Sequence, residues 1–248
     1  MTSKRAIVTG GCGAIGRAVA RRLAAGGCEV IIIDRAEPAA DDSFGRAVSF
    51  HRADLTDSAA VRTAMADATG RLGGLDILVN AAGITSFGSA ARLAEAEWDR
   101  VMAINLKAVF LCCQAAIEPM RARGGGRIVN IGSVLGKNGG NARPWIDPAE
   151  QLASGNIAYG ISKAGVHALT SYLARELAGD AITVNAVAPG PIQSGMTRDF
   201  PDQLRALIPV GRLGRPDEVA AAVAYLIGDE AGFIRGEILD LNGGIWSD

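Results

Sequence analysis

Tyr159 and Lys163 are the residues of this sequence whose types and spacing point most directly to chemistry. They stand four positions apart at the start of a stretch, Ile157–Ala178, whose apolar residues recur at helical spacing. Residues i and i+4 share one face of a helix, so a phenol and an ammonium are expected side by side. The ammonium stabilises phenolate, and we therefore expect it to lower the pKa of Tyr159 from about 10 toward neutral pH.

Such a pair is suited to general acid–base catalysis of an alcohol–carbonyl interconversion. Taken alone, however, Tyr-x-x-x-Lys also occurs as an ordinary pair on an exposed helix face. Its meaning depends on the elements that surround it.

Those elements alternate between short apolar runs and longer helical stretches. Strands are expected at Ala6–Thr9, Val30–Asp34, Ile77–Asn80, Arg127–Ile131, Thr183–Ala188 and Glu237–Leu241, and helices at Ala14–Ala25, Ser58–Leu72, Glu95–Arg123, Ile157–Ala178 and Asp217–Ile227. Nearly continuous apolar strands separated by helices predict βαβ units, hence an α/β fold with a parallel sheet covered on both faces. No linker or repeat divides the chain, so we expect one domain over residues 1–248.

Composition narrows the class of protein. The net charge is −1 and no basic stripe is present, which does not favour nucleic-acid binding. The N-terminus passes straight into a short apolar run and no apolar run reaches the length of a membrane span, so we expect a cytoplasmic protein with no membrane partner. The four cysteines lack metal-ligand spacing, and we expect them to be reduced and no metal to be bound.

A glycine-rich loop follows the first expected strand and opens the first expected helix. Glycines there permit a tight turn, close approach of a pyrophosphate and close packing of helix on strand, and the helix N-terminus offers free N–H groups to phosphates. The position between a strand and a helix makes a nucleotide site the favoured interpretation. The loop residues expected to bind the cofactor are Gly10, Cys12, Gly13, Ala14, Ile15 and Gly16.

The nucleotide is indicated by Asp34, which ends the second expected strand. A carboxylate there can accept hydrogen bonds from both ribose hydroxyls of NAD and would repel a 2′-phosphate. Arg35 follows directly and could pair with such a phosphate, yet the loop itself carries no Arg or Lys. We therefore expect NAD in preference to NADP. The alternative is that Asp34 is only a surface turn residue.

Together these residues resemble the short-chain dehydrogenase/reductase family in its single-domain form, over nearly the whole chain. Thr9-Gly10 through Ile15-Gly16 matches the family's glycine loop with Ala14 in place of its middle glycine. The resemblance implies a Rossmann-type doubly wound sheet and a domain that both binds the dinucleotide and performs catalysis. It also implies further cofactor-binding residues, namely Asp54, Leu55, Asn80, Ala81, Ala82, Gly83, Pro189, Gly190, Ile192 and Ser194, together with Tyr159 and Lys163.

The same resemblance implies a catalytic set of Asn105, Ser133, Tyr159 and Lys163. Tyr159 would exchange a proton with the substrate oxygen and Ser133 would donate a hydrogen bond to it. Asn105 would anchor a water that connects Lys163 to solvent. Asn is also a poor residue for a helix interior, so Asn105 either is a tolerated surface residue or marks a local break in the segment Glu95–Arg123.

The chain between Ser133 and Tyr159 is about twice as long as in most relatives of this family. The extra segment, 137–156, follows an expected strand and is predicted to pass over the active site, where Arg143 and Trp145 are candidate substrate contacts besides Ser133 and Tyr159. A surface loop or a subunit contact is an equal alternative. As a lid, its polar residues favour a small hydroxylated or anionic substrate, since a long acyl chain would prefer a more apolar wall.

The leading hypothesis is therefore an NAD-dependent oxidoreductase that interconverts a secondary alcohol and a ketone on a sugar, polyol or hydroxy acid. The alternative is a 3-oxoacyl-thioester reductase, against which stands Asp34, because biosynthetic reductases usually take NADPH. A catalytically silent NAD-binding regulator is a third possibility that the complete catalytic set argues against. The resemblance also implies a homotetramer, and His167 is expected in a surface or interface role.

Overall fold

Seven parallel strands form the centre of the molecule, in the order β3-β2-β1-β4-β5-β6-β7. The computed structural model describes residues 3–39, 44–140, 153–198 and 200–247. The strands are β1 (Arg5–Thr9), β2 (Glu29–Asp34), β3 (Val48–Arg52), β4 (Ile77–Asn80), β5 (Gly126–Ile131), β6 (Ile182–Pro189) and β7 (Ile238–Leu241). The predicted doubly wound, Rossmann-type sheet is confirmed.

The apolar strands supply side chains to two hydrophobic layers, because successive residues of a strand point to opposite faces. In β1, Ile7 belongs to one layer, whereas Ala6 and Val8 belong to the other. In β2, Ile31 and Ile32 divide in the same way. A strand buried on both faces has no polar side, which explains the continuous apolar runs in the sequence.

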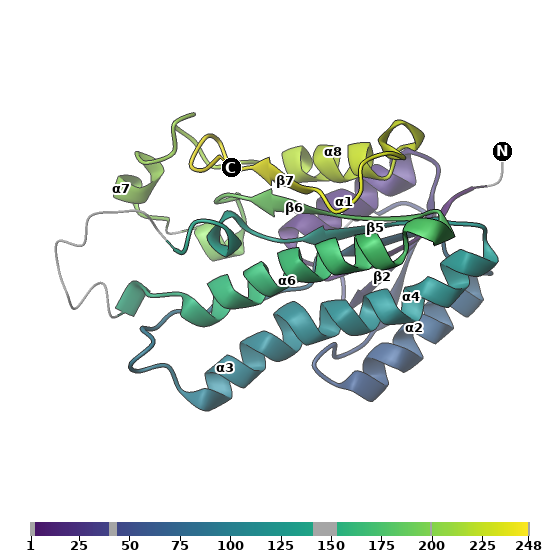
Figure 1. Cartoon of the computed structure of the whole chain (residues 1–248), viewed down its shortest axis with the longest axis horizontal. Helices are drawn as coiled ribbons and strands as arrows, with labels where there is room; N and C mark the ends of the chain where they lie inside the picture. The colour runs from purple at the N-terminus through teal and green to yellow at the C-terminus, as the bar shows by residue number, and fades with distance from the viewer. Residues whose placement is uncertain (1–2, 40–43, 141–152, 199, 248) are drawn as a thin grey trace.

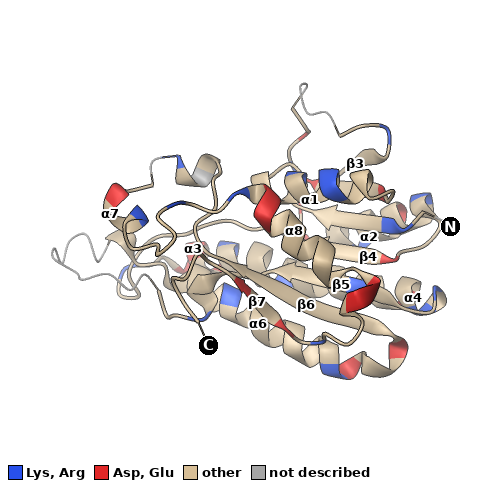
Figure 2. Ribbon diagram, turned by 90° about the horizontal axis from the view of Figure 1, so that it is seen from above, with Lys and Arg blue, Asp and Glu red and all other residues tan. Residues whose placement is uncertain are grey.

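Helices cover both layers (Figure 1). Their bounds are α1 (Ala14–Ala25), α2 (Ser58–Leu72), α3 (Glu95–Met102), α4 (Ala108–Ala122), α6 (Ile157–Glu176), α7 (Asp202–Arg205) and α8 (Pro216–Leu226). Helices α1 and α8 lie on one face of the sheet, and α2, α4 and α6 on the other (Figure 1). Figure 2 shows Lys and Arg interspersed with Asp and Glu over these elements.

The segment expected to be interrupted near Asn105 contains a π-helical turn, η1 (Ala103–Lys107), between α3 and α4. The local break is therefore confirmed, although the helix continues through it. The combined helix Glu95–Ala122 is long and apolar enough to cross a membrane by length and composition alone. Its residues Ala108, Cys113 and Ala116 belong to the hydrophobic layer that α2 and α6 also cover, as expected of a core helix.

Strand β3 and helix α7 were absent from the sequence-based expectations. Strand β3, with the sequence Val-Ser-Phe-His-Arg, pairs with β2 at the edge of the sheet formed by the described residues, and it is half-buried along most of its length. Its mixed polarity hides it from a search for continuous apolar runs. Helix α7 is a single turn, too short to show a helical period.

Sheet order reverses between β1 and β4, since β2 and β3 extend one way from β1 and β4 to β7 the other. In open α/β sheets the crevice at such a switch point, beyond the carboxyl ends of the strands, is where ligands bind. The loops that follow β1, β2, β4, β5 and β6 all meet at this edge.

Candidate active site

A cavity of about 740 Å³ occupies this edge of the sheet. It is lined by 20 of the residues expected to bind cofactor or substrate, namely Gly10, Cys12, Gly13, Ala14, Ile15, Gly16, Asp34, Arg35, Asp54, Leu55, Ala81, Ala82, Gly83, Ser133, Tyr159, Lys163, Pro189, Gly190, Ile192 and Ser194. Arg143 and Trp145 lie outside the described residues. Asn80 and Asn105 lie behind the cavity wall, where both are buried.

The glycine loop brings three backbone segments into close contact. Gly10 has a φ of +67°, and a Cβ there would lie 2.5 Å from Ala82 Cα in the loop after β4. A Cβ at Gly16 would lie 2.2 Å from the Gly10 carbonyl oxygen. Gly13, which precedes α1, has no side chain to cap the first N–H groups of that helix. These groups are consequently available to an anion in the cavity.

Asp34 is held at the cavity edge by two backbone amides. Its Oδ2 accepts from Cys12 N–H at 3.0 Å, and its Oδ1 accepts from Ala36 N–H at 3.1 Å. A carboxylate has about four acceptor positions, so positions remain for ribose hydroxyls. Arg35 beside it is exposed to solvent.

Asp54 lines the same pocket close to Asp34, since the N–H of the preceding residue, Ala53, donates to the Asp34 carbonyl oxygen at 2.9 Å. The Oδ1 of Asp54 accepts from both the backbone N–H and the hydroxyl of Thr56, at 2.9 and 2.8 Å. These hydrogen bonds, the backbone one first, hold the pKa of Asp54 below its ordinary value. The carboxylate is therefore ionised at neutral pH, with Oδ2 available as an acceptor.

A dinucleotide fits these residues. The cavity is large enough for a dinucleotide, and side chains at Gly10 and Gly16 would collide with the backbone around it. The free N–H groups at the start of α1 lie near the Asp34 carboxylate, which Cys12 N–H holds in place. The described part of the chain holds no group of three His, Cys, Asp or Glu residues that could bind a metal ion.

Lys163 is almost fully buried beside Tyr159. Its Nζ donates to the Ile131 carbonyl oxygen at 2.7 Å and lies 5.8 Å from the centroid of the Tyr159 ring. Burial lowers the pKa of Lys163 to about 8. The predicted juxtaposition on one helix face is confirmed.

The expected pKa of Tyr159 is not confirmed. Burial raises the pKa of the phenol above its ordinary value, and a hydrogen bond with Ser133 only partly offsets this. The Lys163 ammonium is directed to the Ile131 carbonyl oxygen and is not among the groups that shift the pKa of Tyr159. The prediction of a lowered pKa is therefore wrong for the protein alone, and the phenol is protonated at neutral pH.

Ser133 follows β5 in an extended conformation, with φ −169° and ψ 150°. Its Oγ accepts from Leu135 N–H at 3.2 Å, which leaves the hydroxyl proton to be donated on the cavity side, where Tyr159 lies. The Ser133–Tyr159 hydrogen bond places both hydroxyl groups around one point, where a substrate oxygen could receive two hydrogen bonds.

Asn105 uses its whole side-chain amide for structure. Oδ1 accepts from Ile84 N–H at 2.9 Å, while Nδ2 donates to the Ile84 carbonyl oxygen and to Ser162 Oγ, each at 3.0 Å. A Cβ at Gly83 would lie 3.4 Å from both Asn105 Oδ1 and Lys163 Nζ. Asn105 thus lies next to Lys163, and its role in a water relay stays a prediction.

Asn80 lies deeper in the structure than the cofactor assignment implied. Its Nδ2 donates to Asn130 Oδ1 at 2.9 Å and to Cys113 Sγ at 3.3 Å. These contacts tie β4 to β5 and α4. Asn80 therefore supports the loop Ala81–Gly83 and does not line the cavity itself.

Sequence reasoning missed two groups of residues around the site. One is an apolar wall formed by Phe87, Phe200, Leu204, Leu207 and Ile245. These residues come from three separate segments, and no local pattern connects them. The other is His167, whose spacing from Tyr159 and Lys163 on the same helix was a signal that could have found it.

Comparisons with known proteins agree with this arrangement. Residues 11–246 match the family model described as "Enoyl-(Acyl carrier protein) reductase". The chain is 38% identical over 253 residues to 3-oxoacyl-[acyl-carrier-protein] reductase FabG of Vibrio cholerae, with 99% of this chain and 98% of the relative covered. It is 36% identical over 253 residues to acetoacetyl-CoA reductase of Allochromatium vinosum, with 97% and 98% covered.

Among solved structures, a short-chain dehydrogenase/reductase from Serratia marcescens superposes with a TM-score of 0.86 at 37% identity, and 98% of each chain is covered. Fold, site and comparisons thus point the same way. The chain belongs to the short-chain dehydrogenase/reductase family, whose members are oxidoreductases acting at a carbonyl or hydroxyl group.

Proposed function

We propose that this enzyme reduces the 3-oxo group of an acyl thioester to a 3-hydroxyl group with NADH. The observation that carries the substrate class is that five apolar residues, Phe87, Phe200, Leu204, Leu207 and Ile245, line the same cavity as Ser133 and Tyr159. Phe87 is 65% exposed and Leu207 49% exposed, so an acyl chain in the cavity would remove apolar area from water there.

Two named relatives support the same substrate class, since they are called reductases of a 3-oxoacyl carrier-protein thioester and of acetoacetyl-CoA. The 3-oxoacyl thioester therefore moves from the alternative hypothesis to the leading one. The polar lid that favoured a sugar or polyol falls largely on residues 141–152, which lie outside the described part of the chain.

The cofactor would lie along the cavity with its pyrophosphate at the glycine loop and the start of α1. Asp34 would accept hydrogen bonds from the adenosine ribose. Lys163, which lies near Tyr159, would donate a hydrogen bond to the nicotinamide ribose. The Ile192 backbone would bind the carboxamide. When bound, reduced nicotinamide supplies a hydride to the carbonyl carbon.

The residues of this chain supply the proton and the orientation. Tyr159, protonated at neutral pH, would donate its proton to the carbonyl oxygen as the carbon accepts hydride. Ser133 would donate a hydrogen bond to the same oxygen and stabilise its developing negative charge. Lys163, with its pKa lowered to about 8, would return a proton to Tyr159, with Asn105 next to it as the proposed link to solvent.

The cofactor preference is tested at Asp34. The Asp34→Ala variant should raise KM for NADH by about 10- to 100-fold, because two charge-assisted hydrogen bonds are lost, and should improve the use of NADPH. Glu29→Ala is the matched control, because it removes an exposed carboxylate at the other end of β2, outside the cavity lining, and it should leave KM for NADH nearly unchanged. A wild-type enzyme that prefers NADPH would contradict the NADH assignment.

A second candidate is an NAD-dependent dehydrogenase of a small polar alcohol. Asn138 and Asn156 favour it, because both are polar and line the cavity near Tyr159, and Asp34 favours NAD, a common acceptor in oxidations. Steady-state kinetics on acetoacetyl-CoA, longer 3-oxoacyl thioesters, polyols, sugars and hydroxy acids separates the two. The proposal expects the highest kcat/KM for a thioester; a polyol or sugar as the best substrate by tenfold or more would replace it.

We further propose a cytoplasmic homotetramer. Phe110 on α4 and Ile161 on α6 are each more than two-fifths exposed, and both helices pack on the same face of the sheet. Pairing of that face between subunits would remove the exposed apolar area from water.

A further inference from the structure

Helix α6 presents a third polar residue on the face that carries Tyr159 and Lys163. His167 follows Lys163 by four positions, so the three side chains form a stripe along the helix. Its side chain is buried, with only 9% exposed. The expectation that His167 lies at the surface is therefore wrong.

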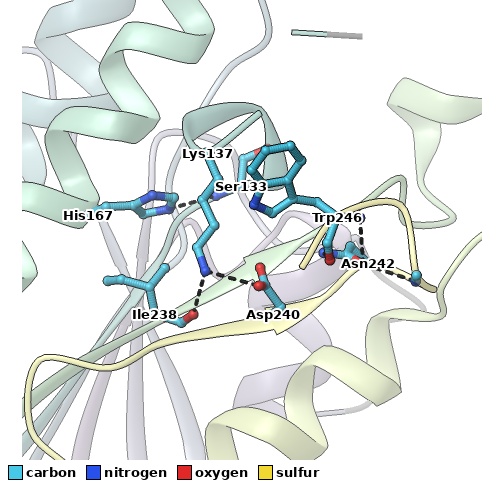
Figure 3. A network of polar contacts seen from close by, with 8 residues as sticks. Ser133, Lys137, His167, Ile238, Asp240, Asn242 and Trp246 are labelled. Carbon is cyan, nitrogen blue, oxygen red and sulfur yellow. Dashed lines mark hydrogen bonds and ion pairs between the residues drawn. The ribbon is translucent and has the colours of Figure 1, made fainter. Parts of the chain in front are cut away.

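The imidazole lies directly behind Ser133. The Ser133 backbone N–H donates to His167 Nε2 at an N···N distance of 3.4 Å (Figure 3). Two glycines make room for the ring, because a Cβ at Gly132 would lie 2.2 Å from Nε2 and a Cβ at Gly136 would lie 2.8 Å from Cε1. The imidazole thus fills a slot between the end of β5 and the turn η2 (Val134–Gly136).

The Ser133 amide needs such a partner. The sheet ladder stops just before it, since Gly132 N–H still donates to the Val187 carbonyl oxygen of β6 at 2.8 Å. A buried N–H beyond the last ladder bond must find another acceptor, and the chain turns here so that Ser133 Oγ can face the cavity. His167 Nε2 is that acceptor.

We propose that His167 is a positioning residue for Ser133, whose imidazole fixes the peptide that aims the Ser133 hydroxyl at the substrate oxygen. An accepting Nε2 carries no proton, so the imidazole is neutral with its proton on Nδ1. The inference rests on the proposed role of Ser133 and is independent of which ketone is the substrate.

The other end of the same turn is anchored separately. Lys137 Nζ donates to the Ile238 carbonyl oxygen at 3.1 Å and to Asp240 Oδ2 at 3.0 Å, which ties the turn to β7 (Figure 3). Residues 133–137 are thus fixed at both ends, and loss of the His167 contact would release the end that carries Ser133.

Kinetics of three variants tests the proposal with the best ketone found for the wild type. His167→Leu keeps the volume but removes the acceptor, and should lower kcat by about 10- to 100-fold while KM for NADH stays within about twofold. His167→Gln can place an amide oxygen near the Nε2 position and should recover kcat to within about threefold of wild type. Ser133→Ala removes the hydroxyl itself and therefore gives the loss in kcat with which the His167 variants are compared.

The outcomes are distinguishable. If Ser133→Ala keeps the wild-type kcat, the proposed role of Ser133 fails and this inference fails with it. If Ser133→Ala loses activity while His167→Leu does not, or if His167→Gln loses as much as His167→Leu, only the inference about His167 is overturned.

A measurement on the wild type does not depend on whether a variant folds. Two-bond ¹H–¹⁵N NMR spectra show which imidazole nitrogen carries the proton, and the chain has only two histidines to assign. His51→Gln identifies the His167 signals by elimination. The proposal expects a neutral ring protonated on Nδ1 at pH 7.5 or so; a proton on Nε2 would overturn it.

Discussion

Burial governs the two titrating side chains at the centre of the site. It raises the pKa of Tyr159 and lowers the pKa of Lys163 to about 8, because the charged form of each group is disfavoured away from water. Both shifts suit reduction, since Tyr159 keeps the proton that it must donate and Lys163 can release one more readily. Oxidation needs phenolate, which the positive charge of an oxidised nicotinamide would favour.

This predicts the pH dependence of the reductase reaction. Lys163 is charged below about pH 8 and loses its proton as the pH rises through that value, so kcat/KM at saturating NADH should fall above about pH 8. The lowered pKa of Lys163 also affects stability, and here the change with pH has the opposite sign to that of the activity. The folded pKa lies below the unfolded value of about 10.4, so the contribution of Lys163 to the free energy of unfolding rises with pH between about 8 and 10.4. A reductase kcat/KM that stays level to pH 9.5 or so would contradict the first prediction.

At the scale of elements, the helix Glu95–Ala122 changes its winding where it meets the site. The π-helical turn η1 orients Asn105 so that it hydrogen bonds both backbone groups of Ile84, in the loop after β4. Single π-helical turns are rare and occur often at functional sites. Here the turn joins the helix layer to the loop that borders Lys163.

Substitution of Asn105 should therefore destabilise the protein. Asn105→Ala removes three buried hydrogen bonds and leaves the Ile84 amide without its partner, so the free energy of unfolding should fall by about 2–4 kcal/mol in urea titrations. The control is Gln114→Ala on the exposed face of α4, which should change it by about 0.5 kcal/mol or less. An equal, small effect of both substitutions would show that η1 is not anchored in this way.

The sequence was sufficient for elements and motifs with a local signature. Each of these signals spans only a few residues of the chain, as in the strands buried on both faces, the glycine loop and the Tyr159–Lys163 spacing. The structure brings the glycine loop, Asp34, Tyr159 and Lys163 to one cavity. Edge strand β3 and the single turn α7 have no such pattern. The raised pKa of Tyr159 and the slot for His167 depend on burial by segments far apart in the sequence, which spacing along the chain does not report.

For the whole molecule, the exposed apolar side chains predict assembly. Phe110→Asp should convert a wild-type tetramer to smaller species in light-scattering measurements, because a carboxylate on α4 would be buried without a partner at the proposed interface. Arg22→Asp on α1 is the control, because Arg22 is an exposed polar residue on the opposite face of the sheet, and it should leave the assembly intact. A monomeric wild type at micromolar concentration would contradict the proposed tetramer.

The proposed reaction depends on one proton donor, Tyr159, beside a bound dinucleotide. Its most direct test is Tyr159→Phe, which removes only the phenolic oxygen, measured both by single-turnover reduction of the best ketone and by NADH binding. We predict a loss of about a thousandfold or more in the rate of reduction, with the Kd of NADH within about threefold of wild type. Reduction at the wild-type rate by Tyr159→Phe would contradict the account.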